Sequence, residues 1–210
     1  MSWTYHWAAG GSSAQPAYSQ FELGRCLVGC GPTAWAMLFC WADRQAATGN
    51  TYWAGRTGLY RFNGGRGEDA LAPILQDGGV ENVIKELHEQ CDTFCAFGSG
   101  ATSPWKMPGA FEYLEGRTSA EARASWNPAA IPQDDLRDRV IDSIVNRRTP
   151  AIVGIGWFDH YPLAWKYRYR TRVILFVTEY DREFYVNQGW GGAGNDWVSA
   201  STWFSGEIYP

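Results

Sequence analysis

Three polar residues have the types and the chain order that thiol-based acyl transfer needs. Cys30 is a candidate nucleophile, His160 a candidate base, and Asn187 a side chain that could fix the orientation of the imidazole. A cysteine nucleophile requires such a base, and the base requires a group that sets its tautomer. The order therefore predicts a Cys–His–Asn triad if the fold brings the three segments together.

The stretch around Cys30 predicts a loop that turns sharply into a buried helix. Gly29 and Gly31 permit the turn, and Pro32 suits the first helical turn. Apolar residues then recur at helical spacing, at Ala34, Met37, Leu38 and Trp41. A helix N-terminus favours an anion, so we expect a lowered pKa for the Cys30 thiol, lowered further by a charged His160. The alternative is that Cys30 only packs beside the helix.

His160 and Asn187 are expected at the ends of neighbouring antiparallel strands. We predict strands over 151–156, from 160 to about 170, over 173–180 and over 184–187, with a turn at 181–182. The residues after Asn187 read Gln188-Gly-Trp-Gly-Gly192. Within them, Trp190 could cover the asparagine–histidine hydrogen bond and keep water from it.

The remaining pattern predicts an α+β protein with its helices first and its strands last. Apolar residues at helical spacing predict a helix with Val80, Val83, Ile84, Leu87 and Cys91 on one face, and another from Pro132 to about Arg148. Residues 43–70 are rich in glycine and predict a long loop. We expect one domain over 1–210, with a helical lobe over about 1–148 and a sheet lobe over about 149–210.

These motifs together resemble papain-like cysteine peptidases. The stretch Cys30-Gly-Pro-Thr-Ala-Trp-Ala-Met resembles the C39-like branch, and Tyr185-Val-Asn-Gln-Gly-Trp-Gly-Gly192 resembles the streptopain branch. The resemblance covers about 20–43 and 150–204. It implies a two-lobe fold in which substrate lies between a helical lobe holding Cys30 and an antiparallel sheet lobe holding His160 and Asn187.

The resemblance also implies an oxyanion hole formed by the Cys30 main-chain N–H and the amide of Gln20. A glutamine side chain in the loop before the nucleophile can direct an N–H at a developing oxyanion. In papain-like enzymes this glutamine usually stands six residues before the cysteine, where this chain has Gly24. Gln20 stands ten residues before Cys30, which is a departure from the pattern.

Composition limits the partners. The formal net charge of −4 gives no overall case for nucleic-acid binding, and no apolar run is long enough to span a membrane. We therefore expect no nucleic acid and no membrane as partners, and the resemblance implies a protein or peptide substrate. The first residues lack a secretory signal pattern, so we expect either no export by that route or a mature or subcloned segment.

The five cysteines leave their redox state open. Two disulfides plus one free nucleophile, or five thiols, would both account for them. The pairs Cys26/Cys30 and Cys91/Cys95 have CxxxC spacing, which is not the usual spacing of zinc ligands. We expect no metal and no cofactor, and a Cys91–Cys95 disulfide or two thiols in place of zinc ligands.

Three functions fit these residues. The leading hypothesis is a cysteine peptidase. The second keeps the triad for an amidase, a deamidase or a transglutaminase-like toxin or effector, because an acyl-thioester is common to all of them. The third is a carbohydrate- or protein-binding domain on an inactive peptidase scaffold, prompted by the 12 tryptophans.

Overall fold

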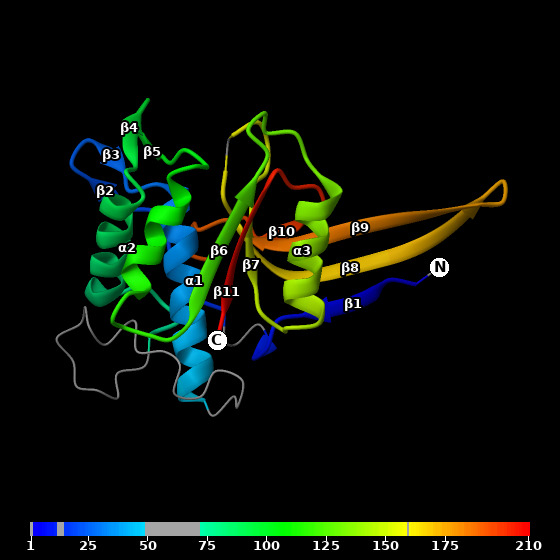
Figure 1. Ribbon diagram of the computed structural model, residues 1–210, viewed down its shortest axis with the longest axis horizontal. Helices are drawn as coiled ribbons and strands as arrows, with labels where there is room; N and C mark the ends of the chain where they lie inside the picture. Colours follow the sequence, from blue (N-terminus) through cyan, green and yellow to red (C-terminus); the bar gives the residue numbers. More distant parts are fainter. Residues whose placement is uncertain (1, 12–14, 49–71, 159) are drawn as a thin grey trace.

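A computed structural model describes residues 2–11, 15–48, 72–158 and 160–210 (Figure 1). The loop predicted over 43–70 lies outside the described residues from position 49 onward. Residues 43–47 belong to a helix.

An antiparallel sheet of seven strands forms the centre of the molecule, in the order β10-β9-β8-β7-β11-β6, with β1 also paired to β8. Its strands are β1 (Thr4–Trp7), β6 (Glu121–Trp126), β7 (Ala151–Val153), β8 (Leu163–Ile174), β9 (Val177–Asn187), β10 (Asp196–Ser199) and β11 (Phe204–Tyr209). Two short hairpins stand apart from it, β2 (Glu22–Leu23) with β3 (Cys26–Leu27), and β4 (Phe94–Ala96) with β5 (Ser99–Ala101).

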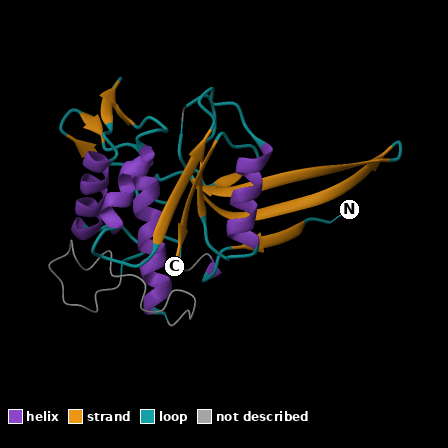
Figure 2. Ribbon diagram, in the orientation of Figure 1, coloured by secondary structure: helices purple, strands orange, loops and turns teal. Residues whose placement is uncertain are grey.

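Helices cover both faces of the sheet (Figures 1 and 2). On one side lie α1 (Cys30–Ala47), α2 (Gly78–Gln90) and the 3-10 helix η2 (Met107–Leu114), and on the other lies α3 (Asp134–Val145). Side chains of a strand alternate between faces, so Ile152 joins the core with α1 while Val153 joins the core with α3. None of these helices, as described, is long and apolar enough to cross a membrane.

The helix α1 is the centre of the larger core. Residues on all of its sides are buried, which is typical of a helix enclosed by other elements. Its Trp35 ring lies 5.3 Å from that of Phe39, and its Trp41 ring lies 6.2 Å from that of Trp165 on β8. The second contact joins α1, the helix that begins at Cys30, to the sheet.

The mixed α+β architecture and the helices predicted around Cys30, 80–91 and 132–148 are confirmed. The proposed division near residue 148 does not match the sheet. The strands β1 and β6 come from the first 148 residues and yet pair with β8 and β11, and α3 packs on the sheet. Strand pairing across the whole chain overrides the order of the elements in sequence.

The predicted strand over 173–180 and turn at 181–182 are wrong. The turn lies at Leu175 and Phe176, and β9 runs without interruption from Val177 to Asn187. Asp181 stays within the ladder because it faces Arg170 across the strands, with a carboxylate–guanidinium distance of 2.6 Å. The apolar residues that predicted the middle of a strand instead form the tip of a long hairpin.

A Cys26–Cys95 disulfide joins β3 to β4. The expected Cys91–Cys95 disulfide is therefore wrong, because Cys91 is a buried free thiol on the far side of the turn into β4. Proximity in the folded structure, and not the CxxxC spacing in the sequence, decides which cysteine pairs with Cys95. The bridge fixes the two small hairpins to each other beside the start of α1.

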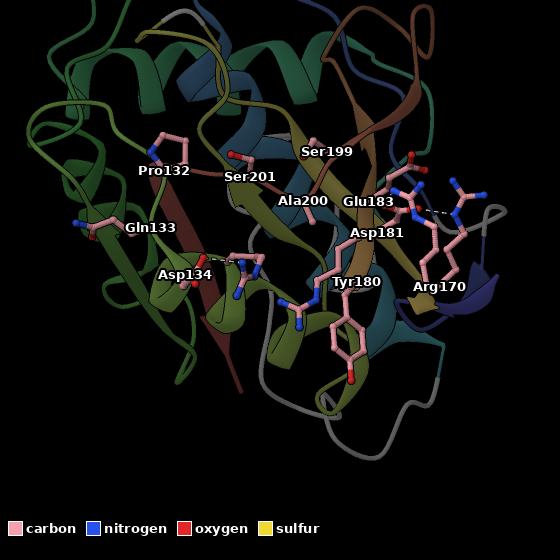
Figure 3. A pocket seen from close by; sticks show the side chains of 13 residues that line it. Pro132, Gln133, Asp134, Arg170, Tyr180, Asp181, Glu183, Ser199, Ala200 and Ser201 are labelled. Carbon is pink, nitrogen blue, oxygen red and sulfur yellow. Dashed lines mark hydrogen bonds and ion pairs between the residues drawn. The ribbon is translucent and has the colours of Figure 1, made fainter. Parts of the chain in front are cut away.

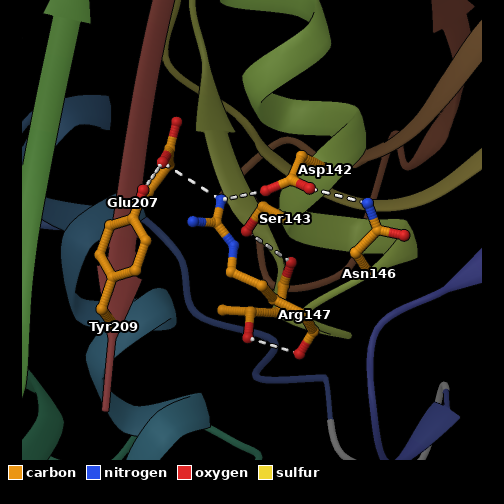
Figure 4. A network of polar contacts seen from close by, with 7 residues as sticks. Asp142, Ser143, Asn146, Arg147, Glu207 and Tyr209 are labelled. Carbon is orange, nitrogen blue, oxygen red and sulfur yellow. Dashed lines mark hydrogen bonds and ion pairs between the residues drawn. The ribbon is translucent and has the colours of Figure 1, made fainter.

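A buried ion pair attaches the end of α3 to β11 (Figure 4). The Glu207 side chain is only 2% exposed, and its carboxylate lies 3.2 Å from the Arg147 guanidinium. The Tyr209 hydroxyl also donates to Glu207, and the Arg147 guanidinium lies 4.3 Å from the centre of the Tyr209 ring. Removing only the cation would leave a buried carboxylate without its counter-charge.

We predict that Arg147→Met lowers the free energy of unfolding by about 3–5 kcal/mol, because it leaves the Glu207 charge buried and unpaired. The double variant Arg147→Met/Glu207→Gln should lose about half of this or less, since its glutamine still accepts from Tyr209 without carrying a charge. Urea unfolding of the three proteins measures both values. Equal losses in the single and double variants would show that the buried charge is not the cause.

Candidate active site

A cavity of about 810 Å³ brings several of the predicted site residues together. Cys30, His160, Gln20 and Trp190 all line it. Its walls also come from the hairpin β4–β5 and from the segment between β7 and β8, including Ser99, Thr102 and Phe158. The cavity therefore lies where the helical side of the molecule meets the end of the sheet.

Cys30 is the first residue of α1, as predicted. The preceding Gly29 has a φ of 103°, a conformation that side-chain-bearing residues rarely adopt. A Cβ at this position would also lie 3.0 Å from the main-chain oxygen of Gly100 on β5. The turn thus requires glycine, and it places the half-buried Cys30 thiol in the cavity wall.

The pKa of the Cys30 thiol is raised, and burial is the largest cause. Main-chain N–H groups of Tyr161, Cys30 and Gly31 act in the opposite direction without overcoming it. The expectation of a lowered pKa is therefore wrong for the resting site. The helix N-terminus acts as expected, but loss of water around the sulfur outweighs it.

The imidazole of His160 is held on one edge by a main-chain hydrogen bond. Its Nε2–H donates to the carbonyl oxygen of Gln188, with an N···O distance of 2.8 Å. In a neutral ring this places the proton on Nε2 and leaves Nδ1 as the basic nitrogen. The Trp190 ring stacks on the imidazole, with ring centres 5.5 Å apart, whereas the prediction was that it covers a bond between Asn187 and His160.

The Asn187 side chain has hydrogen-bond partners other than the predicted imidazole. Its side chain is fully buried, but its Nδ2 donates to the Pro16 carbonyl at 2.8 Å and its Oδ1 accepts from the Gly189 N–H at 3.0 Å. The histidine bond goes to the carbonyl of the next residue, Gln188. Asn187 thus positions the turn that carries the acceptor, where a direct side-chain bond to the ring was expected.

The turn after Asn187 lies against α1, the helix that begins at Cys30. Gly189 has a φ of 73°, and a Cβ there would lie 3.3 Å from the Thr33 Cγ2 atom of α1. Its carbonyl accepts from the Gln20 N–H at 3.1 Å. One short segment therefore contacts α1, His160 and the loop that carries Gln20.

Gln20 lines the cavity with Cys30 although it stands ten residues before it. Residues 18–20 run beside residues 189–191, where the Gly191 N–H donates to the Tyr18 carbonyl at 2.9 Å. Among the described residues, the buried Oε1 atom of Gln20 has no hydrogen-bond partner. An oxyanion would be bound by the Nε2–H group of this amide, whereas the unpartnered oxygen can only accept a hydrogen bond.

Sequence reasoning missed the two main-chain groups of this site. One is the Gln188 carbonyl, which accepts a hydrogen bond from His160. The other is the Tyr161 N–H, which partly offsets the rise in the Cys30 pKa that burial causes. Main-chain groups carry no residue-type signal, so only the fold reveals them. The Tyr161 side chain spans the site as well, since its hydroxyl donates to the Thr102 carbonyl at 3.0 Å.

A second hollow, of about 710 Å³, lies between β9 and the start of α3 (Figure 3). Neither cysteine nor histidine lines it in the described part of the chain. Arg170 and Arg172 reach into it but are bound to Asp181, at 2.6 and 2.5 Å. The arginines of β8 are thus paired with acids of β9, and the described lining of this hollow offers no thiol nucleophile.

No model of a known protein family matches the chain, and no curated protein matches it.

We predict that iodoacetamide labels Cys30 in the native protein and leaves Cys40 and Cys91 unmodified, because burial raises the pKa of both core thiols, that of Cys91 to about 12. The labelling rate of Cys30 should be low at pH 6 and still rising at pH 9, since its raised pKa keeps the thiol protonated. Mass spectrometry of digests gives the rate at each site.

Protein unfolded in denaturant is the control, and there all three thiols should react. Rapid labelling of native Cys30 at pH 6 would contradict a neutral resting thiol and would instead indicate a thiolate–imidazolium pair.

Proposed function

We propose that the protein is a cysteine peptidase that cleaves peptide bonds through an acyl-thioester on Cys30. One observation carries this proposal: the nucleophile candidate at the start of α1 and the imidazole of His160 line the same cavity. A packing cysteine would need neither a solvent-accessible cavity nor a histidine with one ring nitrogen already committed to a carbonyl.

The proposed reaction begins from a neutral pair. As the Cys30 sulfur attacks the substrate carbonyl carbon, Nδ1 of His160 takes the thiol proton. The tetrahedral intermediate then collapses, the C–N bond breaks, and the imidazolium gives its proton to the leaving amine. Water, deprotonated by His160, attacks the thioester and releases the acid and the thiol.

Charge on the carbonyl oxygen develops only during attack, so its donors must be in place beforehand. The Gln20 amide and the Cys30 main-chain N–H are the proposed donors. The position of Gln20 in the wall of the cavity that Cys30 also lines supports this role.

The arrangement also supports the papain-like two-lobe fold as a proposal. A helix beginning at Cys30 faces a sheet whose strand ends carry His160 and Gln188. The two proposed lobes do not correspond to two consecutive parts of the sequence, because β1, β6 and α3 pack with the sheet although they precede residue 148.

We predict that Cys30→Ala abolishes turnover of a fluorogenic peptide library without changing the melting temperature by more than a few degrees. Ser99→Ala is the matched control, since Ser99 lines the same cavity without a proposed chemical role. Adding a primary amine as acceptor and analysing products by mass tells hydrolysis from acyl transfer. Peptide cleavage by the Cys30→Ala variant at the parent rate would contradict the proposal.

We predict that Asn187→Ala lowers kcat by a factor of about ten to a few hundred, because the turn that carries the Gln188 carbonyl loses two hydrogen bonds. Gln188→Ala should retain most of the activity, since the main-chain carbonyl remains. Steady-state kinetics on folded variants measures both. The reverse order, with Gln188→Ala the slower enzyme, would show that a side chain and not the main chain holds His160.

A further inference from the structure

The hairpin formed by β8 and β9 ends in an apolar tip. Residues 173–177 read Val-Ile-Leu-Phe-Val, and the exposed fractions are 87% for Leu175 and 100% for Phe176. Val173 and Val177 are also mostly exposed. Apolar side chains gathered at one protruding point indicate a contact with something outside the chain.

The backbone makes these residue types more notable. Leu175 and Phe176 have φ values of 48° and 71°. Two-residue hairpin turns with positive φ at both positions favour Asn-Gly, and large apolar residues are disfavoured there. Leucine and phenylalanine thus stand at two positions whose backbone conformation disfavours them. This indicates that their side chains serve an interaction and not the turn itself.

The hairpin projects beyond the sheet as an isolated ribbon (Figure 1). The strand β1 pairs with β8 only up to Tyr169, and β10 pairs with β9 only from Glu183 onward. Beyond these points the two strands pair only with each other among the described strands. Five residues of extended chain carry the tip about 17 Å past the last neighbouring strand.

Apolar side chains lie on both faces of the ribbon at the tip. Val173 pairs with Thr178 and Val177 pairs with the residue after Val173, so the two valines point from opposite faces of the ribbon. A strand that docks on a protein surface needs apolar side chains on one face only. A tip with apolar side chains on both faces suits a medium that is apolar on every side, as the hydrocarbon just below the headgroups of a lipid bilayer is.

Residues behind the tip suit the boundary between lipid and water. Tyr180 is exposed, and tyrosine is enriched at that depth. Residues 170–182 hold three arginines against two acids, although the whole chain has a net charge of −4. The ribbon is thus slightly cationic, as contact with anionic headgroups favours.

We propose that the tip of the β8–β9 hairpin inserts into the surface of a lipid bilayer and attaches the protein to it. Our expectation of no membrane partner considered only segments that span a bilayer, whereas surface insertion needs only a few apolar residues. The proposal is independent of the chemistry at Cys30.

The test is co-sedimentation with phosphatidylcholine vesicles, with and without phosphatidylserine. The parent should bind both, and phosphatidylserine should strengthen binding a few-fold. Leu175→Asn/Phe176→Gly should lower the vesicle partition coefficient at least tenfold. Because Asn-Gly is the preferred sequence for such a turn, this variant should melt at the parent temperature or above.

Ile131→Asn is the matched control, because it removes an exposed apolar side chain from the body of the protein. It should leave vesicle binding unchanged. Equal binding by the tip variant, or no vesicle binding by the parent, would overturn the proposal. If the parent did not bind vesicles but formed a dimer, and the tip variant were monomeric, the tip would instead bind a second copy of this chain.

Discussion

The candidate site depends on one hydrogen bond, from Nε2–H of His160 to the carbonyl oxygen of Gln188. An imidazole has two chemically similar nitrogens, and the bond made by one decides which of them can take a proton. A main-chain carbonyl is a pure acceptor, so it fixes the neutral ring in a single tautomer. The assignment of His160 as a base to Cys30 rests on that choice.

Much of the surrounding structure keeps this carbonyl in place. The buried Asn187 amide ties the turn to Pro16, and Gly189 allows the turn to lie against Thr33 of α1. The helix carrying Cys30 and the acceptor that orients His160 are therefore in direct contact. Because α1 is enclosed by the core, packing far from the cavity also sets the geometry of the site.

Local sequence signals predicted what depends on local physics. Gly29, Gly31 and Pro32 predicted the start of α1 at Cys30, and apolar periodicity predicted α2 and α3. Strand pairing is not local, so the membership of β1 and β6 in the sheet, and the Cys26–Cys95 disulfide, could not be predicted. The apolar residues around Phe176 were interpreted as a strand interior because turns are normally polar. Burial of Cys30 depends on side chains distant in sequence, which is why the direction of its pKa shift was missed.

The most direct test of the account is the protonation state of His160 in the resting protein. The chain has only three histidines, so replacing His6 and His88 in turn assigns the signals in a long-range ¹H–¹⁵N correlation spectrum. In conditions where the ring is neutral, the account predicts a proton on Nε2 and an unprotonated Nδ1. A proton on Nδ1 in those conditions would make Nε2, which lies against the Gln188 carbonyl, the unprotonated nitrogen, and would contradict the assignment of Nδ1 as the base.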